Sequence, residues 1–164
     1  IACVEGMALA GGCEIVLGCD MVIASKTAKF GVPETKRSLV AAAGGLFRLP
    51  RKLPLNIAME MNLTGDPLPA ERMHHFGFVN HLAEPGKCLE ESFKLAKRII
   101  VNAPLAVQEA RTAIVEMAVA SEEDCWDASM GAMVNLMQTP DFKEGPKAFA
   151  EKRPPKWTGK RSKM

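Results

Sequence analysis

The chain has 164 residues, of which 48% are apolar and 24% are charged, and this length and composition are sufficient for a globular protein with its own core. The formal net charge of +2 excludes the strong positive field with which proteins attract nucleic acids. No apolar run is long enough to span a bilayer, so we expect no membrane segment and no membrane partner.

The cysteine and histidine residues argue against a metal site and against a disulfide framework. The five cysteines are scattered and form no Cys-x-x-Cys pair, and the three histidines lack the spacing of metal ligands. An odd number of scattered cysteines is typical of buried thiols in a reducing compartment. We therefore expect a cytoplasmic protein without a bound metal.

The first residues resemble the middle of a buried strand. The chain begins with Ile1 rather than with Met, and the apolar stretch that follows contains Glu5, Glu14 and Asp20 but no basic leader. This pattern is not that of a signal peptide, and a native terminus is rarely an isolated core strand. We expect the chain to be a fragment that lacks the N-terminal part of a longer protein.

Short strands and helices alternate in the first half of the chain. Apolar runs predict strands over residues 1–4, 21–24 and 28–32, and a buried helix that extends from Glu14 to Cys19. The third strand is predicted to end in a loop, since the residue before a proline prefers an extended backbone. This order of elements indicates an α/β layer.

Three helices and one strand are predicted next. The glycine pair at residues 44–45 suits a tight turn into a short helix, and two further helices are expected over residues 56–63 and 69–77. Residues 78–82 are predicted to form the last strand.

From Cys88 onward the apolar residues recur at helical spacing only. Helices are predicted to begin near Pro104, Ser121 and Thr139, because proline suits a first helical turn and Ser and Thr are good N-caps. The helix after Ser121 carries an apolar stripe made of Met130, Met133, Val134 and Met137. Such stripes are more often core, but several apolar helices here have few strands to cover, so we expect part of this surface to pack against neighbouring subunits.

We accordingly divide the chain into an α/β part, residues 1–86, and a helical part, residues 87–164, that ends in a basic tail. The simpler expectation for the tail is a solvated terminus, and the alternative is contact with an anionic ligand.

The pair Gly11-Gly12 is the first candidate for chemistry. Backbone N–H groups at the start of a helix lack partners and carry the positive end of the helix dipole, and glycine lets a ligand oxygen approach them closely. The pair could therefore form an oxyanion hole, although glycine pairs also serve in plain tight turns.

Glu14 and Glu34 are the second candidates. Two carboxylates in one pocket can divide acid and base roles, because each charge raises the proton affinity of the other. Glu14 could instead cap its own helix, and Glu34 could be a solvated loop residue. Spacing alone does not show that the two side chains converge.

The pattern of the whole chain resembles the crotonase, or enoyl-CoA hydratase/isomerase, superfamily. The matching blocks, in order, are Ala8-Leu9-Ala10-Gly11-Gly12-Cys13-Glu14, Cys19-Asp20, Phe30-Gly31-Val32-Pro33-Glu34, Ala43-Gly44-Gly45, Arg48-Leu49, Ala58-Met59-Glu60, Leu63-Thr64-Gly65, Gly77-Phe78-Val79-Asn80 and Phe149-Ala150-Glu151-Lys152-Arg153. The resemblance implies the C-terminal part of a crotonase-like ββα spiral core, followed by a helical region that forms homotrimers or dimers of trimers.

The resemblance also assigns roles. The N–H of Gly11 is expected to bind the thioester carbonyl oxygen, Glu14 and Glu34 to hold the water that adds to the double bond, and Glu34 to supply the proton to the α-carbon. Having both glutamates favours hydration or its reverse. Coenzyme A is part of the acyl-CoA substrate, so no separate cofactor is expected.

Substrate contacts are expected from a further group of residues, namely Gly12, Val40, Ala41, Ala43, Gly44 and Lys152. The small side chains of residues 40–43 suggest room for an acyl group, although the same run could be plain alanine packing. Family members carry a substantial segment before this point that supplies the second oxyanion N–H. We therefore expect an incomplete site in this chain.

Three functions remain open at this stage. The first is an enoyl-CoA hydratase of fatty-acid metabolism. The second is a related dehydratase such as a carnitinyl-CoA dehydratase, which the ending with Glu144-Gly145-Pro146 and Trp157 resembles. The third is a truncated fragment that assembles through its helices without catalysis.

Overall fold

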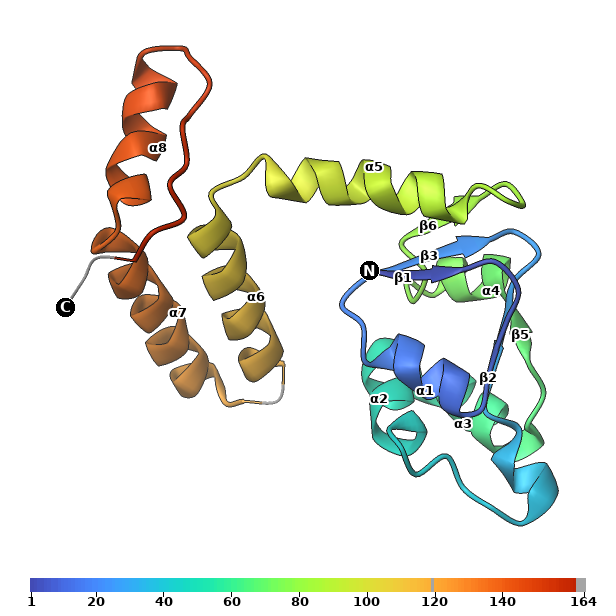
Figure 1. The fold of residues 1–164 in the computed structure, drawn as a ribbon. Helices are drawn as coiled ribbons and strands as arrows, with labels where there is room; N and C mark the ends of the chain where they lie inside the picture. Colours follow the sequence, from blue (N-terminus) through green and yellow to red (C-terminus); the bar gives the residue numbers. More distant parts are fainter. Residues whose placement is uncertain (119, 162–164) are drawn as a thin grey trace. The chain divides into compact units, whose positions relative to one another are not determined.

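The computed structural model describes residues 1–118 and 120–161. The chain forms two compact units, Ile1–Ala96 and Lys97–Met164, whose elements are labelled in Figure 1. The boundary lies within the helix Cys88–Ile100, whereas the sequence predicted it after residue 86. Among the described residues, no helix combines the length and apolar character needed to cross a membrane.

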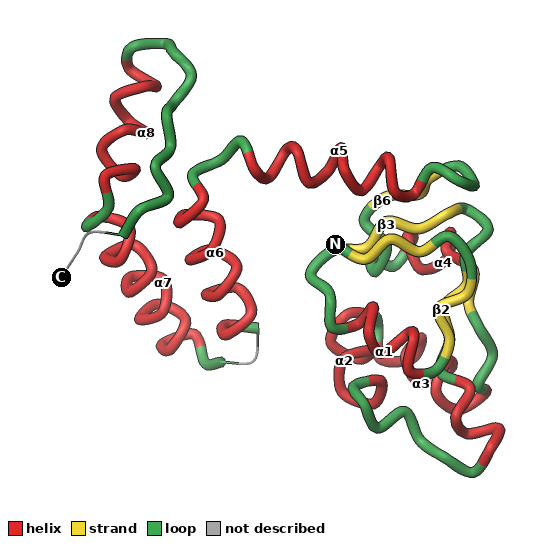
Figure 2. The backbone as a smooth tube through the Cα atoms, viewed as in Figure 1, coloured by secondary structure: helices red, strands yellow, loops and turns green. Residues whose placement is uncertain are grey.

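The first unit contains two small sheets (Figures 1 and 2). One sheet has the parallel strand order β1 (Ala2–Val4), β3 (Val22–Ser25) and β6 (His81–Ala83). The other has the order β2 (Met7–Leu9), β4 (Lys29–Gly31) and β5 (Leu68–Pro69), with β2 and β4 parallel and β5 antiparallel. The expected mixed α/β layer is confirmed.

Helices of the first unit lie between and after these strands. They are α1 (Gly11–Leu17), the 3₁₀ helix η1 (Pro33–Arg37), α2 (Gly45–Lys52), α3 (Leu55–Thr64) and α4 (Ala70–His75). The core between them is centred on Phe30, whose ring meets Phe78 edge to face with the ring centroids 5.4 Å apart. Helix α5 (Cys88–Ile100) starts in this unit and ends in the next.

The structure corrects several element boundaries. Strands β2 and β5 were not predicted, because two or three residues are too few to show an alternating pattern. Helix α1 begins at Gly11 rather than at Glu14, and Glu34 lies in the 3₁₀ helix rather than in a loop. The last strand starts at His81 rather than at Phe78. Phe78 and Val79 are buried in a bend that precedes the strand.

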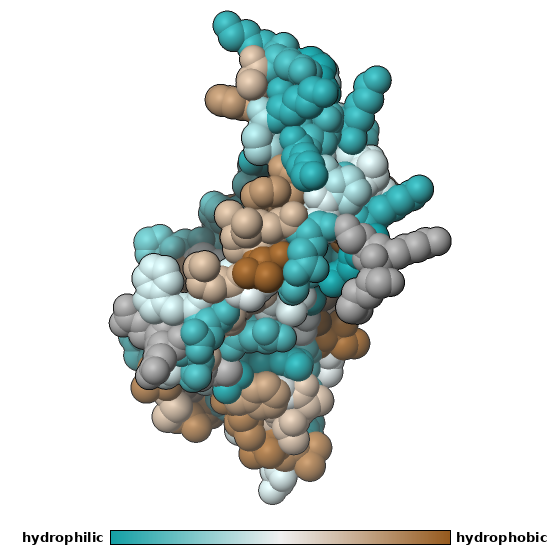
Figure 3. All heavy atoms as spheres, turned by 90° about the vertical axis from the view of Figure 1, so that its left-hand side faces the viewer, coloured by the Kyte–Doolittle hydropathy of each residue, from teal (hydrophilic) through white to brown (hydrophobic). Residues whose placement is uncertain are grey.

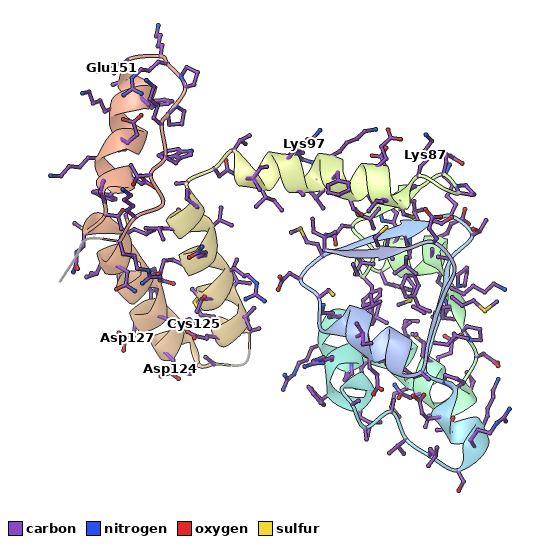
Figure 4. All side chains as sticks on the ribbon, in the orientation of Figure 1. Lys87, Lys97, Asp124, Cys125, Asp127 and Glu151 are labelled. Atoms are coloured by element: carbon purple, nitrogen blue, oxygen red, sulfur yellow. The ribbon has the colours of Figure 1, made fainter. Side chains whose placement is uncertain are left out.

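The second unit consists of α6 (Pro104–Met117), α7 (Glu122–Met137) and α8 (Pro140–Ala150), followed by a returning tail. The predicted N-caps are confirmed, as the hydroxyls of Ser121 and Thr139 accept the N–H groups of Asp124 and Phe142. Figure 4 shows Asp124 in the first turn of α7.

The apolar stripe on α7 reaches the surface of the chain. Met130 and Met137 are 59% and 54% exposed, and Met133 and Val134 are 47% exposed. Figure 3 views the side that carries α7 and α8 and shows apolar side chains among hydrophilic ones. The stripe is therefore not core of this unit, which keeps the expected packing against other subunits open.

The basic tail is folded onto its own unit. Arg153 binds Glu144 with two N–H groups at 2.6 and 2.9 Å, and the N–H groups of Thr158 and Gly159 bind the carboxylate of Asp141 at 2.7 and 2.9 Å. Most of residues 153–161 are exposed, as expected for a solvated terminus, but acidic side chains of α8 hold the segment in place.

Trp157 of the tail closes one side of an apolar cavity in the second unit. Its indole N–H donates to the carbonyl of Val101 at 2.9 Å. The cavity has a volume of about 200 Å³ and is lined by residues that include Leu105, Leu136 and Phe142. The sequence places Trp157 in the tail but carries no signal for this contact.

Candidate active site

Both candidate carboxylates follow the carboxyl ends of two neighbouring parallel strands. Strand β2 leads through Ala10 into α1 (Figure 2), and β4 is followed by Val32 and then η1. Leu9 pairs with Gly31, and the N–H of Ala10 donates to the carbonyl of Gly31 at 2.9 Å. Because carboxyl ends of adjacent parallel strands meet at one edge of a sheet, Glu14 and Glu34 start from the same edge.

Glu14 is a buried carboxylate, with only 6% of the residue exposed. Its Oε1 atom accepts the backbone N–H of Gly45 at 3.0 Å. Gly45 is the first residue of α2. The side chain therefore binds the first amide of a second helix, rather than acting as a cap on the surface of α1.

Glu34 lies in the first turn of η1 and is half-buried. Its Oε2 atom is buried and has no hydrogen-bond partner in the part of the chain that the structure describes. A buried acceptor without a partner costs free energy, so such atoms call for an explanation, and a catalytic role is a common one. The carboxylate is thus not the solvated loop residue that the alternative predicted.

Cys13 lies in the first turn of α1, next to Glu14 in the sequence. It is completely buried, and burial raises the pKa of its thiol to about 12, with the negative charges of Glu34 and Glu14 contributing to the increase. The thiol is therefore protonated at pH 7.

The glycine pair presents amides without partners. The N–H groups of Gly11 and Gly12 have no recorded acceptor among the described residues. A Cβ built on either glycine would meet nothing within 4 Å, so the space in front of both is open. Ala10 turns the chain here with φ at 51°, and its carbonyl already accepts the N–H groups of Cys13 and Glu14.

The residues expected around an acyl group divide into two sets. Val40 and Ala43 are exposed, whereas Ala41 is buried. Gly44 has φ at 131°, a backbone conformation that residues with a side chain rarely adopt, so glycine is favoured there. Lys152 is an exposed residue of the second unit, just after α8, with φ at 52°.

Two residues of this region were not among the predicted site residues. Gly45 supplies the amide that binds Glu14, and Cys13 is the completely buried residue before Glu14. The sequence contained a signal for Gly45, since it is half of a glycine pair, but nothing in that pair distinguishes a turn glycine from an amide donor. A cysteine between a glycine pair and a glutamate gives no signal of its own.

No group of three or more metal-ligating side chains occurs within residues 1–118 and 120–161. All five cysteines are free thiols. The titratable groups at the strand ends are therefore carboxylates and one neutral thiol.

Comparison with known proteins links this arrangement to acyl-CoA chemistry. The sequence profile described as enoyl-CoA hydratase/isomerase matches residues 1–160. The enoyl-CoA hydratase EchA19 of Mycobacterium tuberculosis is 39% identical over 155 residues, which are 94% of this chain and 58% of that protein. The carnitinyl-CoA dehydratase of Salmonella typhi is 37% identical over 166 residues, covering 98% of this chain and 63% of that protein.

Solved structures show the same fold. An enoyl-CoA hydratase from Mycobacterium tuberculosis H37Rv superposes with a TM-score of 0.94 at 49% identity, over 97% of this chain and 63% of the other. EchA1 from Mycobacterium marinum gives a TM-score of 0.94 at 49% identity, over 97% and 65%. The chain thus spans less than two thirds of the length of these relatives.

Proposed function

Because the chain belongs to the enoyl-CoA hydratase/isomerase family, we propose that it carries the acid–base half of an enoyl-CoA hydratase site. The reaction is the reversible addition of water to a trans-2-enoyl-CoA thioester, which gives a 3-hydroxyacyl-CoA. Coenzyme A enters as part of the substrate, so the reaction requires no separate cofactor. The observation that carries this proposal is the position of Glu14 and Glu34 after adjacent parallel strands.

Each group then has a chemical task. Glu14 accepts a proton from the attacking water while the oxygen of that water bonds to the β-carbon. Glu34 donates its own proton to the α-carbon. A proton returned from Glu14 to Glu34 restores the pair. A positioned acid or base of this kind contributes about 10²–10⁴ in rate.

The thioester oxygen gains negative charge as the enolate forms. We assign the N–H of Gly11, which has no acceptor among the described residues, as a donor to that oxygen. One such donor is worth roughly 10²–10³ in rate. A second donor, and the amide of Gly12 as a further contact, complete the proposed oxyanion site in the full-length protein.

Hydration of crotonyl-CoA, followed by loss of ultraviolet absorbance, tests this function in the full-length protein. We expect Glu34→Gln to lower kcat by roughly 10²–10⁴, because amide nitrogen cannot supply the proton. The matched control is Glu84→Gln, which removes a carboxylate that pairs with Lys26 at the surface. A Glu34→Gln rate within a few-fold of the wild-type rate contradicts the assigned role.

The second candidate is a dehydratase that acts on a carnitinyl-CoA thioester. The Salmonella typhi relative named for that reaction aligns with 98% of this chain, slightly more than the 94% covered by EchA19. Both reactions use the same acid–base pair, so competition between carnitinyl-CoA and crotonyl-CoA distinguishes them. A higher kcat/KM for carnitinyl-CoA would favour the dehydratase.

We further propose a homotrimer, or a dimer of trimers, in the cytoplasm. The exposed stripe of Met130, Met133, Val134 and Met137 supports subunit contacts, and five free thiols suit a reducing compartment. The acyl group is proposed to lie near Val40, Ala43 and Gly44, with Lys152 of a neighbouring subunit near the coenzyme A phosphates. Sedimentation of a clean monomer at micromolar concentration would contradict the trimer. An assembled but inactive full-length protein would favour the non-catalytic alternative.

A further inference from the structure

We propose that Gly45 is a positioning residue that fixes the carboxylate of Glu14, and that helix α2 holds Gly45 in place because both ends of α2 bind α1 or the residues just after it. The inference concerns Glu14 in the proposed hydratase reaction and therefore rests on the proposed function. It assigns a role to a backbone amide outside the predicted set of site residues.

The contact itself is a hydrogen bond to a charged group in a buried place. The N–H of Gly45 lies 3.0 Å from Oε1 of Glu14, and only 6% of Glu14 is exposed. Gly45 is the first residue of α2, so this N–H also carries the positive end of a helix dipole. The bond uses Oε1, which leaves Oε2 as the oxygen that accepts a proton from water.

Only glycine lets this amide reach the carboxylate. A Cβ at position 45 would lie 2.5 Å from the Cβ of Ala41, closer than real carbon atoms approach, and 3.4 Å from both Oε1 of Glu14 and Cγ1 of Val32. The loop is closed by the N–H of Leu46, which donates to the carbonyl of Ala41 at 3.1 Å. The requirement at position 45 is therefore one of space between the loop and Glu14.

The other end of α2 is tied to the end of α1. Nζ of Lys52 donates to the carbonyl of Cys19 at 2.7 Å, just beyond the last turn of α1. Nη1 of Arg48 lies 3.5 Å from the Cβ position of Gly18. Cations are favourable at the negative end of a helix. The first residue of α2 thus binds the Glu14 side chain in the middle of α1, and its last residue, Lys52, binds a carbonyl just after α1.

The two glutamates consequently differ in freedom. Glu14 is held by an amide whose position is fixed at both ends of its helix, whereas Oε2 of Glu34 has no partner among the described residues. The contact with α2 thus fixes the orientation of the Glu14 carboxylate.

Proton NMR tests the contact without reference to activity. We expect the Gly45 amide proton to move upfield in Glu14→Gln, since the acceptor loses its charge. Glu5→Gln is the matched control, because Glu5 also binds backbone amides, those of Gly86 and Cys88 at 3.0 and 2.9 Å. It should move those two resonances and leave Gly45 unchanged. A Gly45 resonance that does not respond to Glu14→Gln overturns the proposal.

Kinetics in the full-length protein test the consequence. An amide-to-ester replacement at position 45 removes the N–H and keeps the backbone shape, and we expect it to lower kcat about tenfold or more with little change in KM. Gly45→Ala should also lower kcat, and Ala41→Gly added to it should restore activity, because the clash is relieved and the N–H is kept. A merely structural role would not separate kcat from KM.

The outcomes separate the two proposals. A full-length wild-type protein that does not hydrate crotonyl-CoA defeats the proposed function, while a responsive Gly45 resonance still supports the contact. An active wild type whose ester variant keeps the wild-type kcat overturns the positioning role and leaves the proposed function standing.

Discussion

Glu14 in the first unit and Glu144 in the second both accept a backbone N–H, but Glu144 also binds the guanidinium of Arg153 with both of its oxygens. Asp141 of the second unit is likewise engaged by Thr158 and Gly159. No ion pair to Glu14 or Glu34 occurs among the described residues. A carboxylate whose acceptors are all engaged stabilises structure, whereas one that keeps an acceptor available in a buried place can take part in a reaction.

Among the four tests that follow, the largest effect is expected at Gly11, whose amide has no acceptor among the described residues. Gly11→Val adds a side chain in open space, so the chain should fold with its stability nearly unchanged. The side chain blocks the approach of an oxygen to the amide, and kcat/KM for crotonyl-CoA should fall by roughly 10²–10³. Thermal unfolding serves as the control measurement. A folded variant with wild-type kcat/KM would show that the Gly11 amide is not an oxyanion donor.

The second effect concerns the carboxylate that secures the tail. Asp141→Ala removes the acceptor of three hydrogen bonds, from Thr158 N, Thr158 Oγ1 and Gly159 N. The free energy of unfolding of the second unit should fall by about 2 kcal/mol, because three donors lose their partner at once. Urea unfolding followed by the fluorescence of Trp157 measures this, with Trp126→Phe as background to remove the other signal. Asp127→Ala, on α7, is the comparison variant.

The third effect is a dependence of stability on pH in the second unit. The hydrogen bonds from Arg153 and from the N–H of Lys156 lower the pKa of Glu144 from its ordinary 4.5 to about 2. A lowered folded pKa contributes stability that is complete above pH 4.5 and is lost as the pH falls toward 2. Arg153→Ala should therefore destabilise the protein more at pH 6 than at pH 2. An equal loss at both pH values would contradict the assignment.

The smallest effect distinguishes the cysteines. Cys3 is exposed on β1, whereas Cys13 is completely buried and burial raises the pKa of its thiol to about 12. Since the thiolate is the reactive form, iodoacetamide at pH 8 should label Cys3 well before Cys13. Mass spectrometry of peptides at increasing times gives the order. Early labelling of Cys13 would contradict its complete burial.

The sequence predicted elements that depend on local chemistry. Ser121 and Thr139 were identified as N-caps because a hydroxyl oxygen just before a helix can accept an unpaired backbone N–H of the first turn. The structure confirms both. The strand at β1 and the helix after Gly44 also follow from local apolar runs and turn residues. Strands of two or three residues, such as β2 and β5, left no periodic signal.

The parts that could not be predicted from the residues alone depend on contacts between distant segments. Glu14 and Gly45 are brought together only by the fold, and Arg153 meets Glu144 only because the tail reverses direction. The glutamate pair itself came from a chain-long resemblance, since capping and solvation competed locally. The position of Lys152 near a phosphate stays a prediction.

Ala10 carries a consequence for protein engineering. It is a non-glycine residue with φ at 51° in the turn that aims the amides of Gly11 and Gly12, and such a conformation costs on the order of 1–3 kcal/mol. A screen for heat resistance is therefore expected to select Ala10→Gly, which relieves that strain. The same change would make the turn between β2 and α1 more flexible. Selection for heat resistance would therefore favour glycine at position 10, and selection for turnover would favour alanine.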